Sequence, residues 1–343
     1  DRVVQATLKL LMEPLIDPYF SPNSYGFRPE RNQRQAVEAA QEIVSRGKEY
    51  VVDIDLSKFF DRVNHDRLIA RLKGYIEDTR ILRLIGMNLR SGVMIDGVVE
   101  ATEEGTTQGS PLSPLLSNVV LDELDKELES RGVEFCRFSD DCNIFVGSKK
   151  AAERVMSSIS KFIEKTLRLK VNQEKSKVAL SKYVKFLGMT IMAGTLAISL
   201  ESMQRAMDKV KELTPRGTHQ TKEQTMADIN KWYTGWSGYY EMTQYPTQLR
   251  RIEAHIRRRL RARIIAQQKN RRNLRRLLVK RGIPRSRASA VAYSHSKRWA
   301  LSHMRIVEKA FSNRWFKENV GQLIRSEDKL PHWFSDDRFI KVS

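Results

Sequence analysis

Apolar residues recur at helical spacing in several stretches of the chain, with charged residues between them. The first stretch runs from Val4 to Leu15 and ends near Pro18, and the second runs from Ala36 to Val44. Further stretches of this kind are Leu68 to Ile76, Leu116 to Leu124 and Val155 to Ile163. Each is predicted to form an amphipathic helix.

Strand patterns interrupt these helices. From Tyr50 to Leu56 apolar and polar residues alternate, which places Asp53 and Asp55 together on the face opposite the apolar side chains. Val93 to Val99 is an apolar run broken by Asp96-Gly97, a dipeptide that favours a type I′ hairpin turn. Strands and helices mixed in this order predict an α+β body, an antiparallel sheet backed by helices.

A further hairpin is predicted around the adjacent acids Asp140 and Asp141. Apolar and aromatic residues flank this pair from Phe135 to Val146, so two short strands would meet at a tight acidic turn. Two carboxylates held together repel each other, and a divalent cation with its preference for oxygen ligands would offset that repulsion. Asp also favours turns for its own hydrogen bonds, so a solvated turn is the alternative for the pair taken alone.

From about residue 200 the pattern becomes almost wholly helical and the charge balance changes. Residues 201–343 hold 32 Lys and Arg against 13 Asp and Glu, whereas residues 1–200 hold 29 against 28. Between Arg250 and Arg285 there are 15 basic residues and one acid, Glu253. A balanced front and a basic rear indicate a catalytic body with a polyanion-binding extension.

The two cysteines, Cys136 and Cys142, are too few for a disulfide framework, which fits a reducing cytosol. No apolar run reaches membrane-spanning length, so no membrane partner is expected. The sequence starts at Asp1 inside a helical pattern and not at a methionine, which predicts further natural sequence upstream.

Two-metal nucleotidyl transfer needs carboxylates from separate strands, and Asp55 with Asp140-Asp141 could supply them. The motifs are, in chain order, Asp55-x4-Phe60, Gln108-Gly109, Phe138-x-Asp140-Asp141, Leu169-x-Val171-Asn172-x2-Lys175 and Phe186-Leu187-Gly188. Together they resemble the palm of a reverse transcriptase.

More narrowly, Ser24 to Pro29 and Gln108 to Asn118 are similar to bacterial group II intron-encoded proteins. Lys231 to Tyr240 and Leu249 to Arg261 resemble their thumb, or maturase, domain. The resemblance implies a right-hand polymerase architecture. Fingers, incomplete at the N-terminus, and palm would occupy residues 1–195, and a helical thumb and maturase region residues 196–343.

The resemblance also implies site residues. Asp55, Asp140 and Asp141 would be catalytic and bind Mg²⁺, with Ile54 added to the metal set. Phe60 matches the ring that excludes a 2′-hydroxyl, although core packing is its alternative and Phe59 the fallback for the role. The other nucleotide-binding residues would be Gln108, Gly109 and Lys175. Asp53 is interpreted as a solvated or hydrogen-bonded strand residue.

Basic side chains are expected to bind RNA, because Arg pairs with phosphates and stacks on unpaired bases. These candidates are Arg28, Arg31, Arg257, Arg258, Arg259, Arg261 and Arg263. A solvated helix face is the alternative for any one of them.

By this resemblance the chain is an RNA-directed DNA polymerase and intron maturase working in a cytoplasmic, bacterial ribonucleoprotein. Its partners would be group II intron RNA, an RNA template with a DNA or RNA primer, target DNA and deoxynucleoside triphosphates. Phe138-Ser139 stands where the family usually has Tyr-Ala, which fits a second reading: a domesticated relative in defence or DNA repair. A third is a splicing factor without polymerisation.

Overall fold

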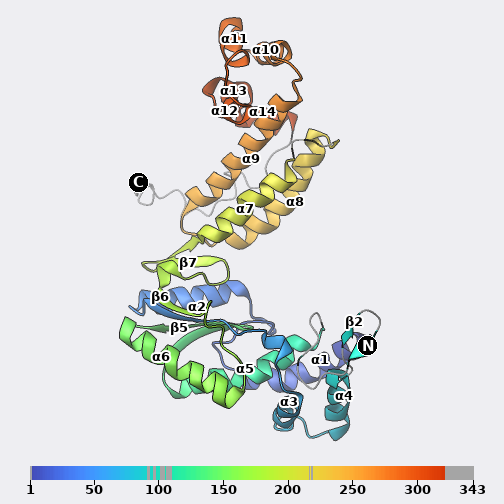
Figure 1. Cartoon of the computed structure of the whole chain (residues 1–343), viewed down its shortest axis with the longest axis vertical. Coiled ribbons are helices and arrows are strands. Elements are labelled where there is room, and N and C mark those ends of the chain that lie inside the picture. The colour runs from blue at the N-terminus through green and yellow to red at the C-terminus, as the bar shows by residue number, and fades with distance from the viewer. Residues whose placement is uncertain are drawn as a thin grey trace. The chain divides into compact units, whose positions relative to one another are not determined.

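The computed structural model describes residues 2–90, 93–95, 98–100, 105, 110–215, 217 and 219–320. The chain divides into two compact units, Asp1–Leu196 (unit 1) and Ala197–Ser343 (unit 2). Figure 1 shows the elements of both. Strands occur with helices in unit 1, and unit 2 is helical apart from the end of one strand, over the residues that the structure describes. The fold is therefore the predicted α+β body followed by a helical region.

Unit 1 begins with helices and contains all but the last residues of the strands in the described part of the chain. Its helices are α1 (Arg2–Ile16), α2 (Gln33–Ser45), α3 (His65–Leu72), α4 (Thr79–Arg90), α5 (Ser113–Ser130) and α6 (Lys149–Phe162), with 3-10 turns at Asp17–Tyr19, Phe59–Asp61 and Ser181–Tyr183 and a π-helix at Ile163–Leu167. Its strands are β1 (Tyr50–Ile54), β2 (Val93–Ile95), β3 (Val98–Glu100), β4 (Glu134–Phe138), β5 (Asp141–Val146), β6 (Lys177–Leu180), β7 (Met189–Met192) and β8 (Thr195–Ile198).

The main sheet has the strand order β4-β5-β1-β6, and each neighbouring pair is antiparallel. Helix α2 lies on one face of this sheet, and α5 and α6 lie on the other (Figure 1). The alternation predicted for β1 explains this packing, because Val52 and Ile54 join the apolar cluster with α5 and α6. Val51, one residue out of phase, lines a small cavity together with Val37 of α2.

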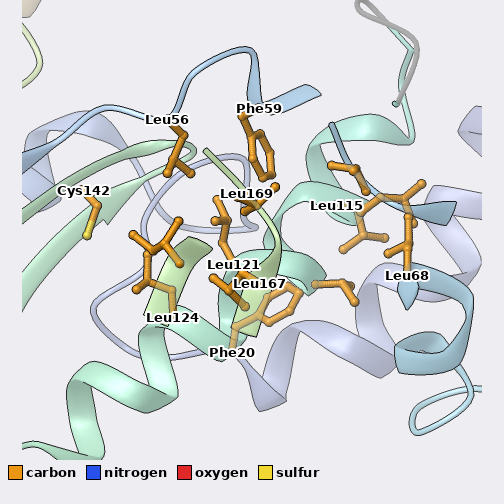
Figure 2. Packing of buried hydrophobic residues seen from close by; sticks show 14 of the residues in the cluster. Phe20, Leu56, Phe59, Leu68, Leu115, Leu121, Leu124, Cys142, Leu167 and Leu169 are labelled. Carbon is orange, nitrogen blue, oxygen red and sulfur yellow. The ribbon is translucent and has the colours of Figure 1, made fainter. Parts of the chain in front are cut away.

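Figure 2 shows part of the apolar cluster of unit 1, where Leu121 and Leu124 of α5 lie near Leu56 and Leu169. Leu56, just beyond β1, is 7% exposed, and Leu169, beyond the π-helix, is 4% exposed. The π-helix helps to place Leu169 in the cluster, because the Leu169 amide donates to the Ile163 carbonyl at 3.1 Å. The cluster thus fixes the chain just after β1 and just after the π-helix.

Two smaller predictions have mixed outcomes. Strands β2 and β3 pair antiparallel with Ile95 opposite Val98, as expected of a two-residue hairpin, while the turn Asp96-Gly97 lies outside the described residues. Helix α1 forms, but it buries one side of its apolar surface. Leu8 and Met12 are buried, and Leu11 remains 57% exposed.

Unit 2 is a set of helices in which α9 is the longest of those described. The helices are α7 (Leu200–Leu213), α8 (Lys222–Tyr240), α9 (Pro246–Gln267), α10 (Arg271–Lys280), α11 (Arg285–Ala292), α12 (Arg298–Leu301), α13 (Arg305–Ala310) and α14 (Asn313–Asn319). The predicted apolar stripe of α9 is buried: Leu249, Ile252, Ile256, Leu260 and Ile264. None of the helices in the described part of the chain is long and apolar enough to cross a membrane.

Candidate active site

The pairing of β1 with β5 brings the three predicted catalytic carboxylates to one end of the sheet. Ile54, the last residue of β1, lies opposite Cys142 of β5. Asp55 directly follows β1 and Asp141 is the first residue of β5, so the two acids come next to this pair at the same end of the sheet. Asp140 occupies the turn that joins β4 to β5. Residues about 85 positions apart in sequence therefore share one site.

The backbone of Asp55 is held on its other side by the segment after the π-helix. The Asp55 amide donates to Ser176 Oγ at 3.1 Å, and the Asn172 amide donates to the Asp55 carbonyl at 2.9 Å. Leu56 and Val171 then form an antiparallel bridge. Asp55 is thus fixed between β5 and this segment.

Lys175, predicted to lie near the leaving pyrophosphate, is close to the carboxylates. Its Nζ is 3.9 Å from Oδ2 of Asp55, and the two side chains are 70% and 41% exposed. An exposed pair of this kind contributes little to stability. The Lys175 ammonium group therefore lies at the exposed side of the site and is only weakly held there.

The acidic turn has a backbone conformation that a neighbouring glycine accommodates. Ser139 adopts a positive φ of 60°. Gly26 approaches so closely that a Cβ on it would lie 2.3 Å from the Ser139 amide nitrogen. The Tyr25 amide also donates to the carbonyl of Arg137 in β4 at 2.9 Å. The motif from Ser24 to Pro29 therefore packs along β4 and against the turn, which sequence reasoning had not foreseen.

Burial and neighbouring charges shift the pKa of two carboxyl groups at this end of the sheet, Asp141 and Asp53. Burial, then the charges of Asp53 and Asp140, raise the pKa of Asp141 to about 7. Burial, then Asp55, raise the pKa of Asp53 to about 6 against the opposing effect of Lys177. Asp53, interpreted from sequence as a solvated or hydrogen-bonded strand residue, is electrostatically part of the acidic cluster. The signal was its i, i+2 spacing from Asp55.

The donor types at this sheet end suit a hard divalent cation. In the described part of the chain, no group of three or more acidic, His or Cys side chains is placed to hold a metal without help. Mg²⁺ is commonly bound through one or two carboxylates plus substrate phosphates, so a preformed cage is not required. The Ile54 side chain is a buried hydrocarbon without a ligand atom, so only its backbone carbonyl could bind a metal.

Phe59 and Phe60 separate into two roles. Phe59 is 2% exposed and belongs to the apolar cluster (Figure 2), whereas Phe60 is partly buried and packs against that cluster. Their rings meet edge to face with centroids 5.3 Å apart. Phe59 is therefore a core residue, which corrects its place as the fallback for sugar selection. Phe60 stays the candidate.

The predicted nucleotide-binding residues Gln108 and Gly109 lie outside the described residues. Gly105, just before them, is anchored to the segment after β1. Its amide donates to the Val63 carbonyl at 2.9 Å, and the His65 ring contacts its carbonyl at 2.5 Å. A Cβ at Gly105 would lie 3.3 Å from the Phe60 carbonyl, and its φ is +98°.

Arg28 was expected to bind RNA, and the structure gives it an internal role. Its Nε lies 2.7 Å from Asp17 Oδ1, and the Arg28 side chain is 6% exposed. Nη1 donates to the carbonyls of Ser21 and Ser24 at 2.6 and 3.0 Å. Arg31 lies over the Tyr25 ring at 5.4 Å and donates to the Pro22 carbonyl. Both arginines hold the loop that supports the acidic turn.

The arginines of α9 are also engaged within unit 2. Arg263, 4% exposed, donates to Thr225 Oγ1 and the Gln220 carbonyl. Arg261 donates to the Phe311 carbonyl at 3.0 Å and pairs with Glu308. These two buried guanidinium groups are structural, contrary to the RNA-binding role expected of them.

The other three RNA-binding candidates on α9 are only partly buried. Arg257 lies 3.7 Å from Glu253, with 21% of its side chain exposed. Arg258 stands over the Trp299 ring at 4.1 Å. Arg259 donates to Thr214 Oγ1 at 2.9 Å. Their RNA-binding role remains a prediction.

Two protein families match this chain in adjoining segments. The family described as "Reverse transcriptase (RNA-dependent DNA polymerase)" matches residues 1–191. The family described as "Group II intron, maturase-specific domain" matches residues 203–282. The acidic sheet end falls in the first match and α9 in the second.

Among individual proteins, protein YkfC of Escherichia coli (strain K12) is 30% identical over 217 residues, 52% of this chain and 57% of that protein. The group II intron-encoded protein LtrA of Lactococcus lactis subsp. cremoris is 32% identical over 141 residues, 41% of this chain and 23% of that protein. The chain therefore spans less than two thirds of either relative. A solved apo telomerase from Candida tropicalis has a TM-score of 0.47 at 13% identity, covering 97% of this chain and 59% of that one.

Proposed function

This chain belongs to the reverse transcriptase (RNA-dependent DNA polymerase) family, and we propose that it copies RNA into DNA and assists the splicing of a group II intron. The supporting observation is the convergence of Asp55, Asp140 and Asp141 at the end of adjacent strands, inside the segment that the family matches. Two strands that each supply carboxylates to one point are what nucleotidyl transfer requires.

Family membership implies dependence on a divalent metal, and we take Mg²⁺ as the ion, held by Asp55, Asp140 and Asp141. When bound, the cation favours deprotonation of the primer hydroxyl and offsets charge on the phosphates. Lys175 would stand beside the outgoing pyrophosphate, because its Nζ already lies 3.9 Å from Asp55. Phe60 would pack under the sugar and exclude a 2′-hydroxyl.

The maturase activity is carried by unit 2. The segment 203–282 matches the maturase-specific family, and residues 201–343 hold an excess of 19 basic residues. Such an excess binds phosphates through counterion release. The proposed partners are group II intron RNA, an RNA template with its primer, target DNA and deoxynucleoside triphosphates, within a ribonucleoprotein.

The test is primer extension on an RNA template by the full-length protein. Asp140→Asn should lower the extension rate by at least about 10²-fold, because it removes transition-state charge stabilisation. Binding of intron RNA should stay at the parental level. Glu134→Gln is the matched control, since Glu134 starts β4 and pairs with Lys48 and Arg46 at the far end of the hairpin. Parental extension by Asp140→Asn would overturn the polymerase assignment.

A further inference from the structure

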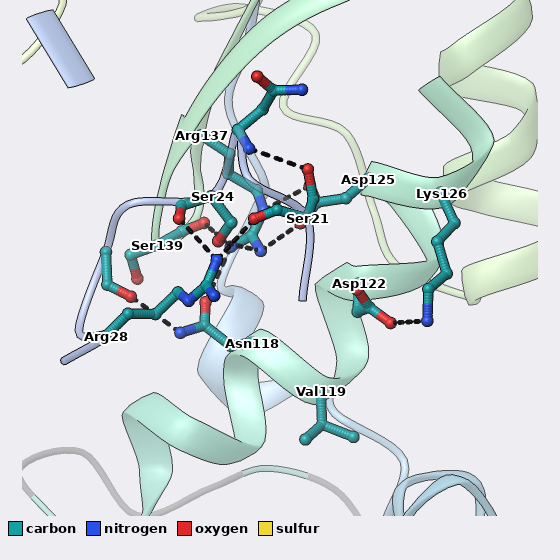
Figure 3. A network of polar contacts seen from close by, with 12 residues as sticks. Ser21, Ser24, Arg28, Asn118, Val119, Asp122, Asp125, Lys126, Arg137 and Ser139 are labelled. Carbon is teal, nitrogen blue, oxygen red and sulfur yellow. Dashed lines mark hydrogen bonds and ion pairs between the residues drawn. The ribbon is translucent and has the colours of Figure 1, made fainter. Parts of the chain in front are cut away.

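A buried arginine connects the acidic turn to the rest of unit 1. Arg137 lies in β4 two residues before Ser139, and its side chain is 0% exposed. A guanidinium cannot lose its charge at physiological pH, so full burial requires that its donors find acceptors. Figure 3 shows its side chain at the centre of a polar network that joins β4, α5 and the loop around Ser24.

The network satisfies the arginine from three directions. Nε and Nη2 donate to the two carboxylate oxygens of Asp125 in α5, at 2.7 and 2.6 Å. Nη1 donates to Asn118 Oδ1 at 3.0 Å and to the carbonyl of Ser139 at 2.8 Å. Nη2 also donates to Ser24 Oγ at 2.7 Å. The bond to Ser139 reaches the acidic turn itself, one residue before Asp140.

The same helix holds the loop on the opposite side of the turn. Asn118 Nδ2 donates to the carbonyl of Gly26 at 2.8 Å. Gly26 in turn contacts the Ser139 amide so closely that a side chain there would displace the turn. The peptide groups on both sides of Ser139 are therefore held, the carbonyl by Arg137 and the amide side by Gly26.

Stability gives little reason for a buried ion pair at this position. Replacing such a pair by apolar residues of similar volume is often neutral or stabilising, because both charges lose their hydration on burial. What apolar residues cannot supply is directed donors to a carbonyl of the turn. A planar fork with five donors can, and lysine cannot reproduce it.

We propose that Arg137 is a positioning residue: by binding the Ser139 carbonyl it sets where Asp140 and Asp141 stand relative to Asp55, and so controls metal affinity at the site. This role rests on the proposed function. Outer contacts that orient metal ligands typically change metal affinity or activity by about 10- to 100-fold when lost.

The test replaces the whole pair, Arg137→Met with Asp125→Leu, in the full-length protein. The matched control is Arg261→Met with Glu308→Leu, a partly buried pair in unit 2. Three readouts are compared: hydrogen exchange of the amides in residues 138–142, binding of Mn²⁺ followed by electron paramagnetic resonance, and the Mg²⁺ concentration that gives half-maximal primer extension. The first two do not depend on activity.

We expect the Arg137 pair variant to exchange faster in the turn while β1 and β5 keep parental protection. Mn²⁺ affinity should fall, and the Mg²⁺ requirement should rise, by about 10- to 100-fold. The control pair should leave all three at parental values. Parental turn exchange and metal affinity in a folded Arg137 pair variant would overturn this role, as would exchange that rises equally over the whole sheet.

If the pair variant does not fold, Arg137→Lys provides the decision, because lysine keeps a positive charge beside Asp125 and lacks the planar fork whose Nη1 donates to the Ser139 carbonyl. A smaller shift of the same three readouts supports the role, and no shift overturns it. The two hypotheses fail separately. Parental extension by Asp140→Asn would refute the polymerase assignment. An inactive Asp140→Asn together with parental readouts for the Arg137 pair variant would refute only the positioning role.

Discussion

The acidic sheet end of unit 1 and the arginines of α9 in unit 2 both concentrate charge, but their charged groups differ in the partners that the fold provides. At the sheet end burial, and after it the neighbouring acids, raise the pKa of Asp141 to about 7 and that of Asp53 to about 6. Along α9, Arg261 and Arg263 donate to carbonyl, hydroxyl or carboxylate oxygens of their own unit.

Donor chemistry explains the difference. Ionised carboxylates only accept hydrogen bonds, so two of them forced together by strand register cannot satisfy each other and need a cation from elsewhere. A guanidinium has five donors, and a helix end or loop carbonyl nearby can take them up. The acids have few and weak partners, Lys175 at 3.9 Å from Asp55 and the Asn143 amide at 3.2 Å from Asp141. Their charge is therefore more available to a ligand than the charge of Arg261 and Arg263.

The largest expected effect is a loss of activity without a loss of stability when a carboxylate of unit 1 is replaced. Asp55→Asn should lower primer extension by about 10² to 10³-fold, yet unit 1 should not lose stability, because one repulsive charge disappears. Hydrogen exchange of β1 and β5 measures that stability. A variant that loses extension and protection together would contradict the comparison, since it would make Asp55 a structural residue.

The second prediction concerns the replacement of arginines in unit 2 by glutamine. Arg261→Gln with Arg263→Gln should destabilise unit 2 by roughly 2–5 kcal/mol, because buried bonds from charged donors are lost. The slope of log RNA affinity against log salt should not change. Arg272→Gln with Arg276→Gln, on the exposed side of α10, should do the reverse and lower that slope by about 1.4 to 1.8.

Tryptophan fluorescence follows this stability directly, because all five tryptophans lie beyond residue 231. Salt-dependent filter binding to intron RNA gives the slope. If the α9 pair lowered the slope and left the melting temperature unchanged, Arg261 and Arg263 would be phosphate ligands after all. The α10 pair serves as the control for ordinary loss of two positive charges.

The strands that carry Asp55 and the Asp140-Asp141 turn could be predicted from the sequence, and the contacts that support the turn could not. Alternation around Asp55 and the acidic turn at Asp140 each have a local signature, so both strands formed as expected. Arg137 has no such local signature of its role. In the sequence it is a basic residue in a short strand, and its acceptor Asp125 lies on the preceding helix.

The same limit accounts for the residues that changed role. Arg28 is an RNA-binding candidate by sequence, yet Asp17 and nearby carbonyls surround it, and no local pattern indicates those contacts. Phe59 and Phe60 are adjacent and identical in type, so only the packing of the 3-10 turn shows which ring is buried. Long-range contacts decide such cases, whereas periodicity reports only local structure.

The smallest predicted effect concerns pH, and it follows from the raised pKa of Asp141. In the unfolded chain this carboxyl titrates near its ordinary value of 3.8, while in the folded protein it titrates near 7. Between those values the folded state holds the extra proton. Stability from this group is therefore fully present below about pH 4 and is lost as the pH rises towards 7. Asp53 adds the same trend up to about pH 6.

Asp141→Asn removes that titration, so without metal the difference in unit 1 stability between variant and parent should grow from pH 5 to pH 8, by a few kcal/mol at most. Asp53→Asn should show a smaller growth that ends at a lower pH, since its pKa is raised only to about 6. Hydrogen exchange of β1 at both pH values measures the differences. Adding Mg²⁺ at pH 8 should restore the protection of β1 in the parent and not in Asp141→Asn. A cation that binds the folded carboxylates stabilises the folded state by mass action. A parent whose protection is equal at pH 5 and pH 8, and indifferent to Mg²⁺, would show that the carboxylates already have partners, as the arginines of α9 do.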